Sequence, residues 1–271
     1  MDVPRQVSRV ALVTGAARGI GRATVHALCS EGYGVVAVDA CSAEGSTRPE
    51  GVSYPLATEA DLRALELAYP GQVVCRVVDV RDAGAMREAA NVAVDTFERL
   101  DVAVAAAAII IGGRPLWETP EAHLRTLFEV DVLGVWNTAA AVVPHMLTGP
   151  EPHGCRFVAL ASAAGSRGLF HLAGYNVAKH AVVGLVRGLA ADLVGTGVTA
   201  VSVSPGSTDT DMLAATAEIY GLPDTSEFAR TQLSRRLLQA DEIAATIAFC
   251  CSVPAAVLNG SDVLASGGFS G

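Results

Sequence analysis

A glycine-rich segment near the start of the chain constrains the fold more than any other feature. Residues 14–21 have the sequence TGAARGIG and lie between an apolar, strand-like run, Val10–Val13, and a helix-like stretch, Gly19–Ser30. A turn of this kind places backbone N–H groups and a helix N-terminus where a pyrophosphate can bind. The segment therefore predicts a nucleotide-binding α/β fold, with an unliganded strand-to-helix turn as the alternative.

Each glycine of this segment has its own physical task. Gly15 permits the tight turn that leaves the strand. Gly19 and Gly21 let the start of the helix approach the pyrophosphate and pack against the sheet. We expect these three residues, together with Arg18 and Ile20 of the same turn, to bind the cofactor.

The residue that ends the next predicted strand indicates which dinucleotide binds. Asp39 follows Gly34–Val38, and a carboxylate at this place can accept hydrogen bonds from the adenosine ribose hydroxyls. It also repels a 2′-phosphate, so NAD is favoured over NADP. Arg18 alone would be compatible with either cofactor. The alternative is that Asp39 only forms a turn at the end of its strand.

Strand-like and helix-like segments alternate along the whole chain, which is typical of a parallel sheet covered by helices. We expect a single domain over residues 1–271 with a Rossmann-type, doubly wound parallel sheet and helices on both faces. The ligand is expected at the carboxyl ends of the strands. The predicted strands are Val10–Val13, Gly34–Val38, Val73–Val78, Val102–Ala107, Phe157–Ala161, Val198–Val203 and Asp262–Ala265. The predicted helices are Gly19–Ser30, Ala83–Arg99, Glu121–Met146, Leu172–Leu193 and Asp241–Cys251.

Two long connections interrupt this alternation, and long ordered connections in compact domains are usually functional. The first, residues 40–71, contains a short predicted helix, Glu59–Ala68, and is expected to lie over the adenosine end of the cofactor. The second, residues 209–239, is expected to cover the substrate. Its apolar residues favour a hydrophobic alcohol or ketone, unless they pack on the domain's own core: Met212, Leu213, Ile219, Tyr220, Leu222 and Phe228.

Composition narrows the classes of function and partner. Apolar residues make up 51% of the chain and aromatic residues only 5%, as in a buried parallel sheet. The net charge of −9 argues against nucleic acid and anionic membranes as partners.

Two features bear on the cellular compartment. The segment Met1–Arg5 lacks the apolar core of a signal peptide. The six cysteines form no disulfide-like framework and are expected to be buried and reduced. We therefore expect a cytoplasmic protein. The six histidines show no metal-type pairing, so no metal is implied.

A second motif carries the expected chemistry. Tyr175 and Lys179 lie one helical turn apart on the same face, and Ser162 follows a predicted strand upstream. Removing a hydroxyl proton near neutral pH requires the tyrosine pKa to fall by ~3 units from about 10, or roughly 4 kcal/mol. Lys179 and an oxidised nicotinamide supply the positive charge for this shift. Ser162 would hold the reacting oxygen.

The glycine turn and the order Ser162, Tyr175, Lys179 together resemble the short-chain dehydrogenase/reductase family, from about Val7 to Gly271. The resemblance implies that Asp79 and Val80 meet the adenine. It also implies that Ala106 and Ala107 contact the ribose through their backbone. The turn after the sixth strand would address the nicotinamide amide and the phosphates through Pro205, Gly206, Thr208 and Thr210.

The chain departs from the family pattern at two places. Residues Ala105–Ala108 stand where Asn-Asn-Ala-Gly is usual, so other groups must replace the asparagine side chains in holding the sheet. Asp131 stands where the family has its fourth catalytic residue, an asparagine. We expect Asp131 to keep the family's helix distortion and to take part in a proton path from Tyr175 through Lys179 to solvent.

A narrower resemblance rests on the first long connection and the C-terminus. Asp39–Cys41, Tyr54–Thr58, Asp61–Leu62 and Gly267–Gly271 resemble the mycofactocin-associated, carveol dehydrogenase-like branch of the family. That branch implies poorly exchangeable NAD and mycofactocin as electron acceptor, and the family as a whole implies a homotetramer. Two alternatives stay open: an ordinary family member with freely exchanging NAD(H), and a non-catalytic NAD-binding regulator.

Overall fold

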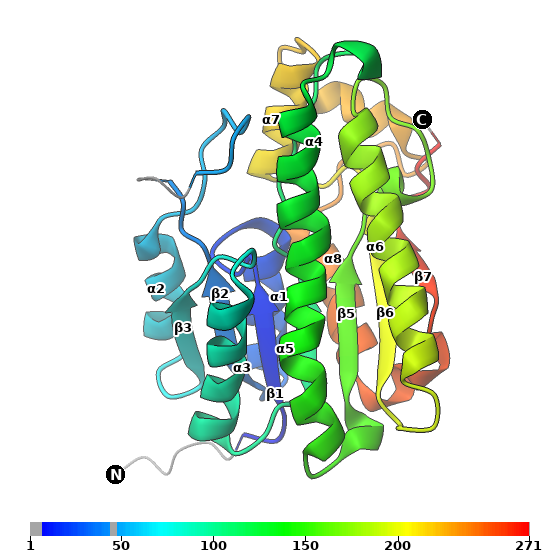
Figure 1. Ribbon diagram of the computed structural model, residues 1–271. Helices are drawn as coiled ribbons and strands as arrows, with labels where there is room; N and C mark the ends of the chain where they lie inside the picture. The colour runs from blue at the N-terminus through cyan, green and yellow to red at the C-terminus, as the bar shows by residue number, and fades with distance from the viewer. Residues whose placement is uncertain (1–6, 44–47, 271) are drawn as a thin grey trace.

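The protein is described by a computed structural model for residues 7–43 and 48–270. The expectation for Met1–Arg5 and the part of the first connection at residues 44–47 lie outside the described residues. Seven strands form one parallel sheet in the order β3-β2-β1-β4-β5-β6-β7 (Figure 1). This confirms the predicted doubly wound sheet. The strands are β1 Val10–Thr14, β2 Gly34–Asp39, β3 Val73–Val77, β4 Val102–Ala105, β5 Arg156–Leu160, β6 Thr199–Pro205 and β7 Asp262–Ala265.

The central strands are apolar because helices cover both of their faces. All five residues of β1 are buried, as are all four of β4, and such unbroken burial is typical of parallel sheets. The strand order reverses between β1 and β4, which pair in parallel from Ala11 with Val102 onward. At such a reversal the connections leave toward opposite faces, and a crevice opens at the carboxyl ends of the strands.

The helices form two layers around the sheet (Figure 1). One layer is formed by α1 Gly19–Ser30, α2 Glu59–Ala68 and α8 Ala240–Cys251. The other layer is formed by α3 Ala83–Phe97, α5 Gly134–Thr148 and α6 Ala173–Asp192. Two shorter helices, α4 Glu121–Leu127 and α7 Asp211–Ile219, lie at the end of the sheet where the strands terminate. Each layer has its own apolar core, and the sheet separates the two.

The predicted helix Glu121–Met146 is interrupted. Between α4 and α5 the residues Phe128–Leu133 form one π-helical turn, a feature that often occurs at functional sites. The wider turn carries the side chain of Asp131, which is fully buried. The segment Glu121–Thr148 is long and apolar enough to cross a membrane by length and composition, yet more than half of its most apolar part is buried in the fold. It therefore has the character of a core helix.

All six cysteines are free thiols. Cys29, Cys155, Cys250 and Cys251 are buried as expected, whereas Cys41 and Cys75 are only half-buried, which corrects the prediction for these two. Burial raises the pKa of the Cys75 thiol to about 11, so it is protonated near neutral pH.

Candidate active site

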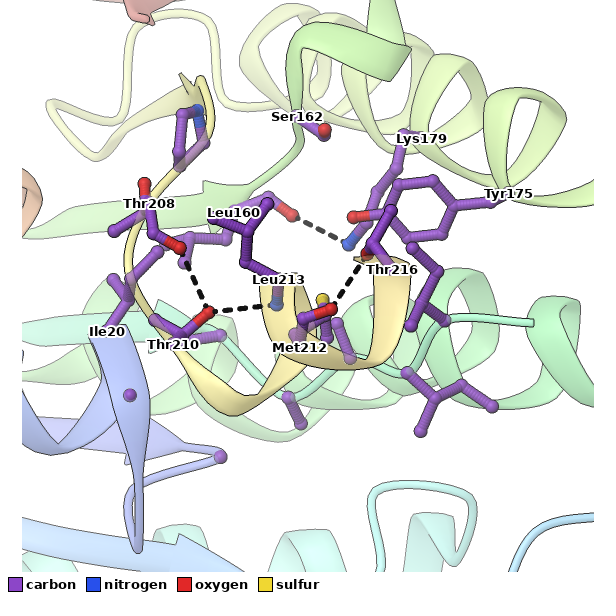
Figure 2. A pocket seen from close by; sticks show the side chains of 18 of the residues that line it. Ile20, Leu160, Ser162, Tyr175, Lys179, Thr208, Thr210, Met212, Leu213 and Thr216 are labelled. Atoms are coloured by element: carbon purple, nitrogen blue, oxygen red, sulfur yellow. Dashed lines mark hydrogen bonds between the residues drawn. The ribbon is translucent and has the colours of Figure 1, made fainter. Parts of the chain in front are cut away.

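A pocket of about 510 Å³ lies at the carboxyl ends of the strands, and three of the four catalytic candidates line one end of it (Figure 2). Ser162, Tyr175 and Lys179 all line this pocket, whereas Asp131 lies behind it. Every residue expected to bind the cofactor lines it too: Gly15, Arg18, Gly19, Ile20, Gly21, Asp39, Asp79, Val80, Ala106, Ala107, Tyr175, Lys179, Pro205, Gly206, Thr208 and Thr210. The structure thus brings both motifs of the sequence to one cavity.

The glycine turn forms a cradle that side chains would fill. Gly15 has a φ of +64°, and a Cβ there would lie 2.8 Å from Ala107 Cα. Gly19 also has a positive φ, of +53°. No side chain of the described residues caps the start of α1, where Arg18 is the extended N-cap residue. The N–H groups of this helix start therefore remain available, and they fit the pyrophosphate of a dinucleotide.

Gly21→Ala is expected to destabilise the fold and to abolish dinucleotide binding. A Cβ at Gly21 would lie 2.0 Å from the carbonyl oxygen of Gly15, which is backbone and has no room to move. Thermal unfolding and NAD titration measure the two effects. The control is Gly188→Ala in α6, where a Cβ meets nothing within 4 Å, so stability should stay equal or rise by up to ~1 kcal/mol. Unchanged NAD binding in Gly21→Ala would contradict the proposed role of the turn.

Two backbone N–H groups hold the carboxylate of Asp39. Its Oδ1 accepts a hydrogen bond from the N–H of Cys41 at 3.0 Å, which forms a turn after β2. Its Oδ2 accepts from the N–H of Ala17 at 3.1 Å, which ties the carboxylate to the glycine turn. The side chain still lines the pocket. It is therefore held in place at the wall of the pocket.

Asp79 is engaged by its neighbour. The Arg81 guanidinium donates hydrogen bonds to both oxygens of the Asp79 carboxylate, at 2.6 to 3.0 Å. The arginine holds the Asp79 carboxylate at the wall of the pocket, which Val80 also lines. An adenine amino group at this place would share the carboxylate with Arg81.

The catalytic end centres on a buried lysine. Lys179 is 1% exposed and pairs with Asp131 Oδ2 at 3.1 Å. Its Nζ also donates to the Leu160 carbonyl oxygen at 3.2 Å, and lies 5.6 Å from the centre of the Tyr175 ring (Figure 2). Two partners on different elements thus hold the ammonium beside the phenol.

The buried charges set the proton affinity of the phenol. The pKa of Tyr175 lies above its ordinary value: burial raises it most, the Lys179 ammonium lowers it, the Asp131 carboxylate raises it again, and a hydrogen bond with Ser162 lowers it. The lowering that was expected from Lys179 is present, but burial and Asp131 outweigh it. Burial disfavours the charged form of Lys179, but Asp131 and Tyr175 outweigh this and raise its pKa. The ammonium is therefore firmly charged, while Asp131 offsets part of its effect on the phenol.

Three side chains replace the asparagines that are absent after β4. Thr14 Oγ1 accepts from the N–H groups of Ala106 and Ala107 at 3.1 and 3.2 Å. Asp131 Oδ1 accepts from the N–H of Ile109 at 2.9 Å, and the Tyr54 hydroxyl accepts from the N–H of Ile110 at 3.0 Å. The roles of Thr14 and Tyr54 were not apparent in the sequence, although Tyr54 belongs to Tyr54–Thr58, one of the segments that carry the narrower family resemblance.

The substrate half of the pocket is apolar. Of the six apolar residues named above for the second long connection, Met212, Leu213, Tyr220 and Phe228 line the pocket, while Ile219 and Leu222 do not line it and pack on apolar clusters. The hydroxyl of Thr216 is turned to the Met212 carbonyl oxygen at 2.7 Å. The half of the pocket beyond Ser162 and Tyr175 is therefore suited to an apolar group.

Comparisons of sequence agree with this arrangement. The family model described as Enoyl-(Acyl carrier protein) reductase matches residues 15–270. The chain is 36% identical over 262 residues to the short-chain reductase protein NovJ of Streptomyces niveus, covering 96% of this chain and 93% of NovJ. It is 35% identical over 212 residues to (-)-trans-carveol dehydrogenase of Rhodococcus erythropolis, covering 77% of this chain and 74% of that enzyme.

Solved structures show the same architecture. Carveol dehydrogenase from Mycobacterium avium in complex with NAD matches with a TM-score of 0.89 and 28% identity, covering 98% of this chain and 99% of the other. Levodione reductase matches with a TM-score of 0.85 and 27% identity, covering 97% and 98% of the two chains. A parallel sheet, a glycine turn and the matched family model lead to one assignment. The chain belongs to the short-chain dehydrogenase/reductase family of oxidoreductases.

Proposed function

We propose that this protein is an NAD-dependent oxidoreductase that transfers a hydride between an apolar secondary alcohol or ketone and nicotinamide. The observation that carries the proposal is the position of Ser162, Tyr175 and Lys179 at one end of the pocket that begins at the glycine turn. The relatives named as carveol dehydrogenases and the apolar lining beyond Tyr175 support this class of substrate.

The side chains divide the chemistry among themselves. When bound, NAD supplies the hydride acceptor. The Tyr175 phenolate removes the hydroxyl proton of the alcohol, and Ser162 holds the same oxygen so that its carbon faces the cofactor site. Lys179, fixed by Leu160 and Asp131, stabilises the phenolate and is placed to pass the proton toward solvent. Asp131 holds Lys179 in position and belongs to this proton path.

We propose further that the first long connection retains NAD in the site. Ser42, Pro49, Leu56 and Ala57 of this connection line the pocket, and the Arg18 guanidinium donates to the Pro55 carbonyl oxygen at 2.5 Å. A cofactor covered in this way is reoxidised in place, so electrons leave to an external carrier. Because the chain resembles the mycofactocin-associated, carveol dehydrogenase-like branch of the family, we propose that this carrier is mycofactocin.

Assembly is part of the same proposal. Large apolar side chains on the outer surface of the π-helical turn, α5 and α6 are exposed: 49% for Leu133, 62% for Trp136 and 48% for Val177. Second copies of this chain would cover them in a homotetramer. We place the assembly in the cytoplasm.

Protein purified without added nucleotide and then denatured is expected to release NAD(H) at close to one mole per mole of chain. Chromatography and mass spectrometry identify the nucleotide. NAD(H) at this level, together with oxidation of apolar alcohols by artificial acceptors, supports retention. Release of no nucleotide, combined with turnover on free NAD, would contradict retention and indicate an ordinary dehydrogenase. NAD binding without turnover on any alcohol or ketone would indicate a regulator.

A further inference from the structure

Tyr54 comes from the first long connection, yet its side chain lies deep in the molecule. It is 4% exposed, and its hydroxyl reaches the N–H of Ile110. Burial raises the pKa of Tyr54 to about 12, the hydrogen bond to Ile110 and the Arg18 charge lower it, and the Asp131 and Tyr175 charges raise it. The phenol is therefore neutral and lies close to the catalytic groups.

The backbone around Tyr54 is held from two sides. The Arg48 guanidinium donates to the carbonyl oxygens of Tyr54 at 2.5 Å and Val52 at 3.0 Å. The Arg18 guanidinium lies 5.5 Å from the centre of the Tyr54 ring, a cation–π distance, while it also bonds the next carbonyl, that of Pro55. The phenol is thus presented to Ile110 by a preformed section of the connection.

Tyr54 and Asp131 bind adjacent residues. The N–H of Ile110 donates to Tyr54, and the N–H of Ile109 donates to Asp131, whose other oxygen pairs with Lys179. Because both N–H groups belong to one short backbone segment, a movement of Tyr54 is felt at Asp131. The cover of the pocket is in this way connected to the catalytic lysine through two hydrogen bonds, the backbone between Ile109 and Ile110, and an ion pair.

We propose that Tyr54 is a positioning residue that couples cofactor retention to the placement of Lys179. The inference deepens the proposed function and depends on it for the identity of the cofactor. With the Tyr54 hydroxyl seated on Ile110, the connection stays closed and Asp131 holds Lys179. With the hydroxyl removed, the N–H of Ile110 lacks its partner, which favours an open connection.

The test is Tyr54→Phe, which removes one oxygen and keeps the ring that packs in the core. Wild type and variant are loaded with NAD, and dissociation is followed after addition of excess labelled NAD. The variant is expected to release NAD about tenfold faster. Hydrogen exchange at the Ile110 amide should accelerate, and the pH profile of kcat should change because Lys179 is held less firmly. Tyr33→Phe is the control, because the Tyr33 hydroxyl accepts from Arg9 at 2.6 Å beside the start of β2, at the end of the sheet away from the pocket, and its loss is expected to change none of the three readouts.

The outcomes separate the two proposals. Equal dissociation rates and equal Ile110 exchange in Tyr54→Phe and wild type would overturn the coupling while leaving retention of NAD intact. Faster dissociation with an unchanged pH profile would also overturn it, because Tyr54 would then only fasten the cover. Rapid dissociation from the wild type itself would contradict retention, and Ile110 exchange and the pH profile of Tyr54→Phe would still decide the coupling.

Discussion

Tyr175→Phe is expected to reduce kcat for alcohol oxidation by about 10²- to 10⁴-fold, because it removes the general base and keeps the ring. The phenol is buried beside Lys179, and its ring makes the cation–π contact at 5.6 Å that phenylalanine preserves. The NAD affinity should therefore stay within about threefold of the wild type, a change of less than ~0.7 kcal/mol. Steady-state kinetics and NAD titration on the same preparation measure both.

Tyr33→Phe again serves as the control and should leave kcat unchanged. Turnover of Tyr175→Phe at the wild-type rate would remove Tyr175 from the chemistry. If the wild type and the variant both bind NAD and neither turns over any alcohol or ketone, the alternative of a non-catalytic NAD-binding regulator would be favoured. Loss of NAD binding in the variant would instead show that the residue serves mainly to hold the cofactor.

Asp131→Asn is expected to move the pH dependence of oxidation toward lower pH by about one unit, or ~1.4 kcal/mol. Oxidation requires the Tyr175 phenolate, so its rate rises with pH through the pKa of this group. The ionised Asp131 carboxylate raises that pKa. Removing its charge lowers the pKa, and the rising limb moves to lower pH. The profile of kcat against pH measures the shift.

The matched control is Asp192→Asn at the exposed end of α6, which should leave the profile unchanged. An unchanged or upward-shifted profile in Asp131→Asn would contradict the electrostatic role. Asparagine has one acceptor oxygen, whereas one oxygen of Asp131 accepts from the N–H of Ile109 and the other forms the ion pair with Lys179. Some loss of stability is therefore expected alongside the shift. Asp131→Ala should cost more, about 3–5 kcal/mol, because it removes the counter-charge of a buried ammonium and also leaves the N–H of Ile109 without its acceptor.

Local chemistry explains why so much of the fold was predictable. The glycine turn, the strand endings and the helix starts are encoded by neighbouring residues, and Glu59–Ala68 has the predicted bounds because Thr58 and Asp61 form a capping box. The expected cofactor residues follow the same logic, since parallel strands deliver their carboxyl ends to one edge of the sheet.

The contacts that the sequence did not reveal are hydrogen bonds between residues far apart along the chain. The hydrogen bond between Tyr54 and Ile110 joins residues 56 positions apart, and no periodicity or spacing marks such a pair. Thr14 was seen only as the first residue of the glycine turn, although its hydroxyl holds Ala106 and Ala107 on the neighbouring strand's end. The alanines at these positions indicated that partners were missing, and only the packing of the elements identified them.

The exposed tryptophan of α5 determines what the intrinsic fluorescence of this protein can report. The chain has two tryptophans, Trp117 and Trp136, and their side chains are 81% and 62% exposed. An isolated chain would emit as if its indoles were in water both before and after unfolding. A blue-shifted spectrum would therefore report neighbouring copies packed against the indoles. Loss of this blue shift on heating would report dissociation of the assembly rather than unfolding of the core.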